Sequence, residues 1–177
     1  MSNYLRNYAD GACYFLTLNL EQRINNPILM DNIDLLRMSF KQVKKKHPFK
    51  INAIVILPDH IHLLLTLPEA SSDYTNIIRT VKAYFSKHLA KTEYISTVRN
   101  KRSERGIWQR RFWEHTIQDQ QDFNNHMDYI HWNPVKHGYV SQVKDWPHSS
   151  FHRCVEDGVY ALDWCAVTGL SELEIGE

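Results

Sequence analysis

The chain has 177 residues, of which 43% are hydrophobic and 23% charged, and its formal net charge is +1. This length and balance are typical of one compact domain and exclude an intrinsically disordered protein. No apolar stretch is long enough to span a membrane, the first residues do not resemble a secretion signal, and the three cysteines fit neither a disulfide framework nor a zinc knuckle. We therefore expect a cytoplasmic protein with reduced thiols.

Positive charge is concentrated in one part of the chain. Residues 79–111 carry ten basic and two acidic side chains, a surplus of +8, and a second basic group lies within residues 41–50. Residues 154–177 carry six acidic side chains and no lysine or arginine, which gives −6. The two regions cancel in the net charge, yet the basic part can still present a face that binds phosphates. Alternatively, these lysines are solvent-exposed side chains on helix surfaces and bind nothing.

The hydrophobic pattern predicts alternating strands and helices. In chain order, the predicted elements are a strand at 13–19, a helix at 30–47, strands at 51–57 and 60–67, a helix at 75–89, a basic loop at 91–106, a long strand at 107–117 and a helix at 119–132 that Asn133 and Pro134 interrupt. The remainder is predicted to be irregular. The first six strands and helices have the order of an α+β, ferredoxin-like fold, in which two helices pack on one face of an antiparallel sheet. The last helix is then free to cover the open face.

Two histidines begin the apolar strand at 60–67. Residues two apart in a strand point to the same face, so His60 and His62 stand side by side while Ile61 and Leu63 point into the core. Two neighbouring imidazoles can chelate a divalent cation. The alternative is a pair of half-exposed side chains on an open sheet.

A catalytic metal site needs a further ligand, because such sites usually have about three protein ligands and leave positions for substrate. Two nitrogens with an amide or carboxylate oxygen would suit Mg²⁺ or Mn²⁺, whereas a third histidine or a glutamate would indicate zinc. Asp59 lies next to the pair, but it is in a turn, so strand alternation does not fix the direction of its carboxylate.

The last predicted helix carries a tyrosine away from its apolar stripe. That stripe contains Phe123, Met127 and Ile130. Tyr129 instead aligns with Asn133, four residues further on. A tyrosine can act as a covalent nucleophile when a base or a metal activates its phenol, although most helical tyrosines only pack with a hydrated hydroxyl. The proline after Asn133 disfavours helical backbone there, so that side chain need not lie one turn beyond the tyrosine.

Three segments in this order resemble the REP-associated tyrosine transposases, which belong to the HUH single-tyrosine transposases. They are VILPDHIHL at 55–63, WQRRFWEH at 108–115 and DYIHWNPVKHG at 128–138. The opening SNY at 2–4 with Gly11, and DWPHSSFH at 145–152, are also similar to that family. The resemblance covers nearly the whole chain. Its specificity comes from the combination, since a lone HxH or a lone tyrosine would not be specific.

The resemblance implies a transposase domain over residues 1–152, and an acidic tail at 153–177 that packs on it. His60, His62 and Asn133 would hold Mg²⁺ or Mn²⁺. Tyr129 would attack a DNA phosphodiester to give a 5′-phosphotyrosine and a free 3′-OH, so that the strand can be rejoined. The substrate would be single-stranded DNA that carries an imperfect hairpin, the REP element. We expect a monomer, although related insertion-sequence enzymes are dimers that supply the tyrosine in trans.

Several basic and aromatic side chains are predicted to contact DNA. In the long predicted strand, Arg110 shares a face with Phe112 and Arg111 shares the other with Trp113, so each face offers a cation for phosphate and a ring for an unpaired base. The predicted set is Arg79, Lys82, Arg110, Arg111, Trp113 and Lys136. Trp113 is equally well explained as a core residue. Two other functions stay open, namely a non-catalytic nucleic-acid-binding regulator derived from a transposase and a zinc hydrolase that uses the same histidines.

Overall fold

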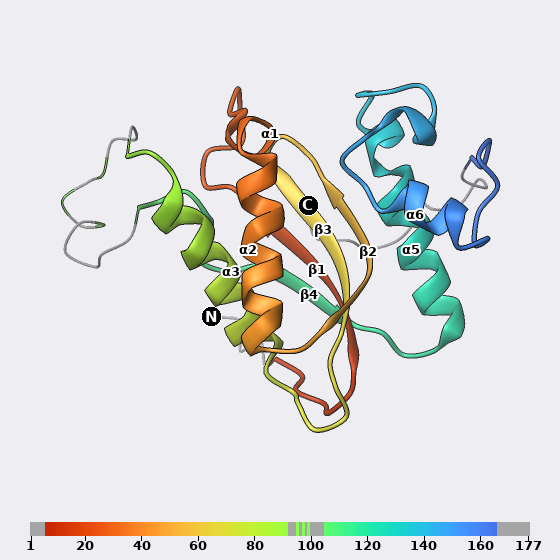
Figure 1. The fold of residues 1–177 in the computed structure, drawn as a ribbon, viewed down its shortest axis with the longest axis horizontal. Coiled ribbons are helices and arrows are strands. Elements are labelled where there is room, and N and C mark those ends of the chain that lie inside the picture. Colours follow the sequence, from red (N-terminus) through yellow and green to blue (C-terminus); the bar gives the residue numbers. More distant parts are fainter. Residues whose placement is uncertain (1–5, 92–94, 96, 98, 100–104, 166–177) are drawn as a thin grey trace, which may run out of the picture.

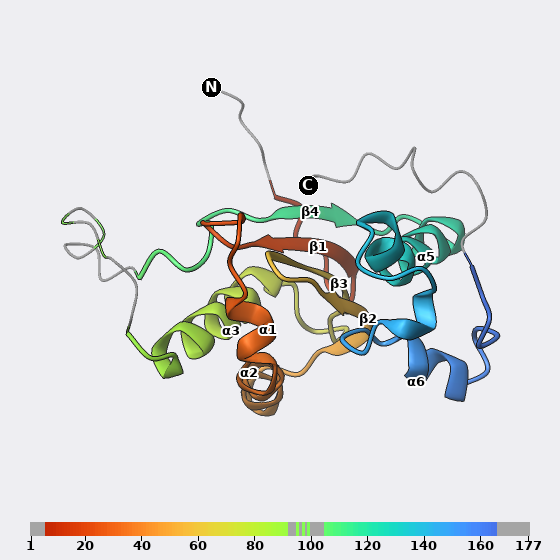
Figure 2. The same cartoon turned by 90° about the horizontal axis from the view of Figure 1, so that it is seen from above.

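A four-stranded antiparallel sheet with the order β2-β3-β1-β4 organises the protein. Its strands are β1 (Cys13–Asn19), β2 (Lys50–Ile56), β3 (His60–Thr66) and β4 (Trp113–Thr116). The structure, a computed structural model, describes residues 6–91, 95, 97, 99 and 105–165. Helices α2 and α3 lie on one side of the sheet, and α5 and α6 lie on the other (Figures 1 and 2). This arrangement confirms the predicted α+β, ferredoxin-like class.

The first layer of helices comprises α1 (Ile28–Asp31), α2 (Ile33–Lys46) and α3 (Tyr74–His88). The apolar side of α2 and α3 packs on the strand residues that point toward it, which include Leu16, Leu18, Ile61, Leu63 and Leu65. The helix predicted at 30–47 is divided, because Asn32 has the non-helical angles φ −125° and ψ 33°. Its side-chain amide donates to the carbonyl of Ile28 at 2.9 Å and so closes α1.

Helix α5 (Gln120–Lys136) covers the second face of the sheet. A separate apolar cluster there contains Phe15, Val55 and Leu64 from the strands and Met127, Tyr129 and Ile130 from α5. Strand alternation therefore sends Ile61 and Leu63 toward α2 and α3 and the two histidines toward α5. The predicted division of β3 between two faces is confirmed.

The predicted interruption of α5 at Asn133 and Pro134 is wrong. The helix continues to Lys136 with both residues buried, so packing outweighs the local disadvantage of the proline. The chain turns away from the helix at Gly138, whose φ of +71° suits a residue without a Cβ. The amide of Tyr139 bonds the carbonyl of Pro134 at 2.9 Å, and that of Gly138 bonds Val135 at 2.9 Å, which is a Schellman ending.

The strand predicted at 107–117 is also shorter than expected. Its ladder with β1 spans Trp113–Thr116, and an isolated bridge joins Trp108 to Leu20. Between them, the carbonyl of Gln109 accepts a hydrogen bond from Lys82 Nζ at 3.1 Å, which draws this segment toward α3. The expected alternation of Arg110 and Arg111 between two strand faces is therefore wrong, because neither residue lies in the strand.

The segment after α5 contains short helices, whereas the sequence suggested irregular chain. These are η1 (Val143–Asp145) and α6 (Phe151–Glu156). Between them, the carbonyl of His148 accepts from the amide of Ile56 at 2.8 Å, and the amide of Ser150 donates to Ile54 at 2.8 Å. The chain thus lies along the outer edge of β2. Most of the predicted basic loop, and residues 166–177 of the predicted tail, fall outside the described residues.

The sequence also predicts that the chain has no membrane span and that its cysteines are reduced. Within the described parts of the chain, no helix combines the length and the apolar character that a membrane span needs. Cys13, Cys154 and Cys165 are free cysteines.

Candidate metal centre and tyrosine site

The two histidines of β3 point their Nε2 atoms at each other. His60 Nε2 lies 3.2 Å from His62 Nε2, and the two residues are 1% and 0% exposed. They stand side by side, as predicted from their spacing. The alternative of a half-exposed pair is wrong, because helix α5 covers this face of the sheet.

A layer of hydrogen bonds holds the far side of each imidazole. His60 Nδ1 lies 2.8 Å from Asp59 Oδ1, and His62 Nδ1 lies 2.9 Å from Thr17 Oγ1. Asp59 Oδ2 also accepts from Arg23 Nε at 2.7 Å. When each Nδ1 carries the ring proton, both Nε2 lone pairs face the same point, which is how outer partners orient metal-binding histidines. The carboxylate of Asp59 thus points to the far side of His60 and bonds both His60 and Arg23.

Burial and neighbouring groups shift the pKa values of His62 and Asp59. Burial lowers the pKa of His62 well below its ordinary value, and the neighbouring His60 lowers it further, so the ring is neutral. Burial would raise the pKa of Asp59, but the hydrogen bond and charge of His60, followed by those of Arg23, outweigh it and lower this pKa. The imidazole of His62 is therefore neutral, and the carboxylate of Asp59 is ionised.

Helix α5 brings Tyr129 to the histidine pair. Its ring centroid is 5.3 Å from that of His62, and the side chain is 1% exposed. The phenolic oxygen accepts a hydrogen bond from Lys136 Nζ at 2.9 Å. Lys136, which was predicted to contact DNA, therefore contacts the tyrosine. The ring of His137, one residue further, is 5.4 Å from that of His60.

Asn133 fits the role of a further ligand. It follows Tyr129 by one helical turn, so both side chains leave the same side of α5. The residue is fully buried, and neither its Oδ1 nor its Nδ2 has a hydrogen-bond partner within the described residues. A buried amide without a partner is costly, and a bound cation would satisfy the oxygen. Two imidazole nitrogens and this oxygen suit a divalent cation.

Three predicted DNA-binding residues line a basic groove between α3 and residues 105–112. Its volume is about 900 Å³. The basic and aromatic side chains along it are Arg79, Lys82, Lys87, Arg99, Arg105, Arg110, Trp108 and Phe112. Burial, and then the charge of Arg6, lower the pKa of Lys82 to about 8. The carbonyl of Asn19 accepts from Gln109 at 3.0 Å and Asn19 pairs with His60, so the groove and the histidines share one end of the sheet.

The remaining two predicted contacts lie elsewhere. Arg111 is exposed and outside the lining of the groove. Trp113 is half-buried and packs edge-on to Phe15, with ring centroids 5.7 Å apart, against the apolar cluster under α5.

Sequence reasoning missed a second cluster of polar side chains. His115 Nε2 lies 2.7 Å from Asp122 Oδ2, and His126 Nδ1 lies 2.9 Å from Asp122 Oδ1. Burial lowers the pKa of His126. Burial would raise the pKa of Asp122, but its contacts, of which the hydrogen bond from His115 is the strongest, outweigh burial and lower this pKa. The spacing of four between Asp122 and His126 was a visible signal, but the approach of His115 depends on the turn between β4 and α5.

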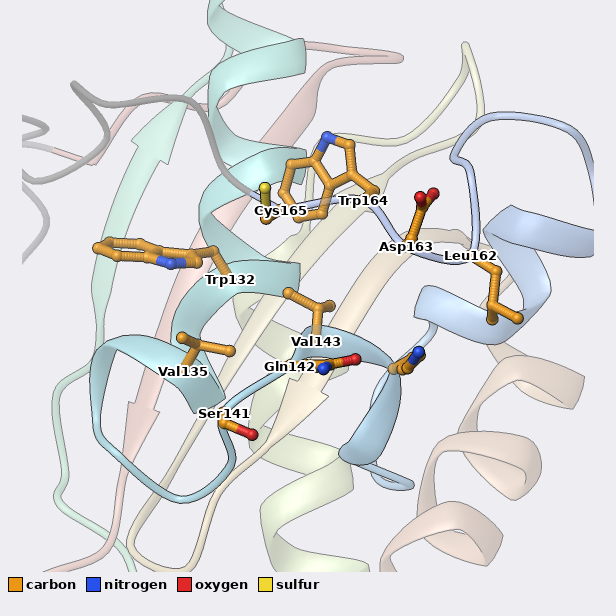
Figure 3. Close-up of a pocket in the computed structure, with 10 residues that line it drawn as sticks. Trp132, Val135, Ser141, Gln142, Val143, Leu162, Asp163, Trp164 and Cys165 are labelled. Atoms are coloured by element: carbon orange, nitrogen blue, oxygen red, sulfur yellow. The ribbon is translucent and has the colours of Figure 1, made fainter.

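A small pocket of about 120 Å³ lies between the end of α5 and residues 162–165. Figure 3 shows Trp132 and Val135 of α5 with Val143, Leu162 and Trp164 around it. The histidine pair and Tyr129 are not among the residues that line it. This pocket is separate from the candidate site.

A ferredoxin-like sheet that presents a buried His-x-His pair to a tyrosine on an added helix has the arrangement of a single-tyrosine transposase. Residues 20–133 match the family described as transposase IS200 like. The chain is 50% identical over 165 residues to a protein of Haemophilus influenzae assigned as a REP-associated tyrosine transposase, with 93% of each chain covered. It is 43% identical over 164 residues to the REP-associated tyrosine transposase of Escherichia coli K12, which covers 93% of this chain and 91% of that one.

A solved structure gives the same result. The structure of a REP-associated tyrosine transposase bound to a REP hairpin matches with a TM-score of 0.85 and 40% identity, covering 100% of this chain and 98% of that chain. The chain therefore belongs to the IS200-like transposases and, within them, to the REP-associated tyrosine transposases.

Proposed function

We propose that this protein is a metal-dependent endonuclease and strand transferase that nicks and rejoins single-stranded DNA at REP hairpins through Tyr129. One observation carries the proposal. The buried tyrosine ring lies 5.3 Å from that of His62, whose Nε2 faces the Nε2 of His60 at 3.2 Å. A nucleophile candidate and a chelating pair thus meet in one chain.

The metal ligands in this proposal are His60, His62 and the side-chain oxygen of Asn133. A set of two nitrogens and one amide oxygen suits Mg²⁺ or Mn²⁺. Such a cation, when bound, polarises the scissile phosphate and offsets charge on its oxygens. Asp59 and Thr17 keep the two rings oriented, which is the reason for their hydrogen bonds to the Nδ1 atoms.

The reaction exchanges one phosphoester bond for another. The phenolic oxygen of Tyr129 bonds to the phosphorus, the bond from phosphorus to the 3′ oxygen breaks, the phenol loses its proton and the departing 3′ oxygen gains one. The products are a 5′-phosphotyrosine and a free 3′-OH. Rejoining is the reverse, in which a 3′-OH attacks the phosphotyrosine. The ammonium of Lys136, 2.9 Å from the phenolic oxygen, stabilises the negative charge that this oxygen carries as it enters or leaves.

We assign phosphate contacts to the basic groove. Arg79, Lys82 and Arg110 line it, and it lies at the end of the sheet where the histidine pair is found. The matched solved transposase is bound to a REP hairpin, and a hairpin held along a row of cations would keep its single-stranded flank near Tyr129. Exposed Arg111 can extend this row, whereas Trp113 is engaged in packing.

The tyrosine and the histidines meet within one chain, which supports a monomer that cleaves in cis. We further propose a domain at 1–152 on which the following chain packs, supported for the described residues 153–165 by the 2.6 Å hydrogen bond from Tyr160 to Asp128 Oδ1. Free cysteines accord with a cytoplasmic location.

The test uses a REP hairpin oligonucleotide labelled at its 3′ end, incubated with Mn²⁺ and resolved on a denaturing gel. The wild-type protein should give a labelled covalent adduct, because a 5′-phosphotyrosine retains the 3′ fragment. Tyr129→Phe should give no adduct while still binding the hairpin, and Tyr139→Phe, at an exposed tyrosine, should behave as wild type. Hairpin binding that EDTA leaves unchanged, with no adduct from any variant, would establish a non-catalytic regulator instead.

A further inference from the structure

Three side chains with metal-binding chemistry meet where β4 faces the first turns of α5. His115 comes from β4, and Asp122 and His126 come from α5. One ligand atom from each of these residues lies within 4.8 Å of the other two. The carboxylate of Asp122 lies between the two imidazoles, with one oxygen 2.7 Å from His115 and the other 2.9 Å from His126.

We propose that His115, Asp122 and His126 form a second cation site, which takes a divalent transition-metal ion of the zinc type. Two imidazole nitrogens and one carboxylate oxygen are a donor set of zinc and cobalt, whereas Mg²⁺ and Ca²⁺ prefer oxygen ligands. The second site therefore differs in its cation chemistry from the His60–His62–Asn133 set.

The geometry requires only a local adjustment. Zinc lies about 2 Å from each nitrogen or oxygen ligand, so two ligand atoms on one ion are up to roughly 4 Å apart. The cluster would close to this size by rotation of His115, whose side chain is 34% exposed and is the most exposed of the three. Its exposed side leaves room for water as a fourth ligand. The cation would replace the hydrogen bonds that now join Asp122 to the two rings, including the 2.9 Å contact of His126 Nδ1 with the Asp122 backbone carbonyl.

Packing holds the cluster ready and apart from the tyrosine site. The rings of His115 and His126 are 4.8 Å apart and nearly parallel, at 15°. Phe15 contacts His126 with ring centroids 4.7 Å apart, and its ring is also 5.4 Å from that of His62. This phenylalanine thus separates the two sites. A cation bound at the second site would tie β4 to α5, three residues before Tyr129 on the same helix.

Cobalt titration of an untagged protein tests the proposal independently of DNA cleavage. The His60→Ala, His62→Ala double variant removes the first site, and it should bind one Co²⁺ per chain, with a visible absorption band that Zn²⁺ displaces. Adding His115→Gln should abolish the band, and Asp122→Asn should do the same. His152→Gln, at an exposed histidine of α6, should leave it unchanged.

Two results would overturn the proposal. One is a double variant that folds, as judged by circular dichroism, and binds no Co²⁺; the other is binding that survives both His115→Gln and Asp122→Asn. If the double variant does not fold, the number of Co²⁺ bound per chain is compared between the wild type and the single His115→Gln variant. His115→Gln should bind one Co²⁺ fewer than the wild type. Loss of nicking by Tyr129→Phe has no bearing on either result, so this proposal and the proposed function fail separately.

Discussion

Lys136 donates a hydrogen bond to Tyr129 across two turns of the same helix, with Nζ 2.9 Å from the phenolic oxygen. The ammonium also lies 4.8 Å from the centre of the tyrosine ring. Residues seven apart in a helix share a face, so the continuous course of α5 past Pro134 makes this contact possible. The helix therefore supplies the proposed nucleophile together with a cation beside it.

Lys136→Met should slow both nicking and rejoining by about 100-fold, the size of effect seen when one donor to a developing oxyanion is lost. Single-turnover adduct formation and its reversal measure this, with hairpin affinity determined in parallel. Lys41→Met, at an exposed position of α2, is the matched control. Unchanged rates with weaker hairpin binding would make Lys136 a DNA contact only.

Asn133→Leu should stabilise the metal-free protein while it removes activity. The wild-type amide is fully buried without a partner within the described residues, and a leucine, which has the same branched skeleton without polar atoms, removes about 1–3 kcal/mol of that penalty. Thermal unfolding in EDTA should show a higher Tm for the variant, and Mn²⁺ should raise the Tm of the wild type but not that of Asn133→Leu. Asn124→Leu, at an exposed site of the same helix, should behave as the wild type in both conditions. A lower Tm in EDTA would mean that the amide has a structural partner.

Lys82→Met should increase stability and weaken hairpin binding. Burial lowers the pKa of Lys82 from 10.5 to about 8, so the folded protein carries this charge at a cost. Between these pH values the unfolded chain holds a proton that the folded chain releases, and stability therefore rises with pH. The variant should lose this rise, and the slope of log affinity against log salt should fall by about 0.7–0.9 if one phosphate contact is lost.

Lys87→Met provides the control for that experiment, because Lys87 lines the same groove but is exposed. It should weaken binding without a gain in Tm. Equal effects of the two substitutions on stability would show that burial of Lys82 carries no cost.

Acid should destabilise the protein through His131. Burial lowers the pKa of His131 from 6.5 to about 3, and Arg153 adds to this shift. The unfolded chain gains a proton near pH 6.5 that the folded chain refuses, so stability falls by up to about 1.4 kcal/mol per pH unit between pH 6.5 and 3. His131→Gln, which can keep a hydrogen bond to Ser150, should flatten this part of the curve in urea unfolding. The same slope for variant and wild type would assign acid sensitivity to other groups.

Local periodicity was sufficient to predict part of this molecule. The alternation in β3 placed His60 and His62 on one face, and helical spacing placed Tyr129 and Asn133 together. The prediction of a helix break at Pro134 was wrong, because the preference of proline against helical backbone is weak compared with the stabilisation from burial of the helix end. The predicted interruption of α5 and the long strand predicted at 107–117 failed for the same reason, which is that tertiary contacts outweighed local pattern.

The outer partners of the site could not be predicted. Thr17 meets His62 across 45 positions of the chain, and Arg23 meets Asp59 across 36. These contacts depend on strand register, which pairs Thr17 with His62. The approach of His115 to Asp122 was hidden for another reason, because it depends on the turn between β4 and α5, which joins these residues seven positions apart.

The segment at 148–150 also determines how copies of this chain can associate. An exposed strand edge is a template on which a second polypeptide can add, and this is a common route to fibrils and exchanged strands. The carbonyl of Ile54 accepts from the amide of Ser150 and the amide of Ile56 donates to the carbonyl of His148, and these bonds occupy that template along β2. Sheet extension is then confined to the β4 edge, whose ladder spans four residues. The protein can thus be present at high concentration with little tendency to polymerise through its sheet.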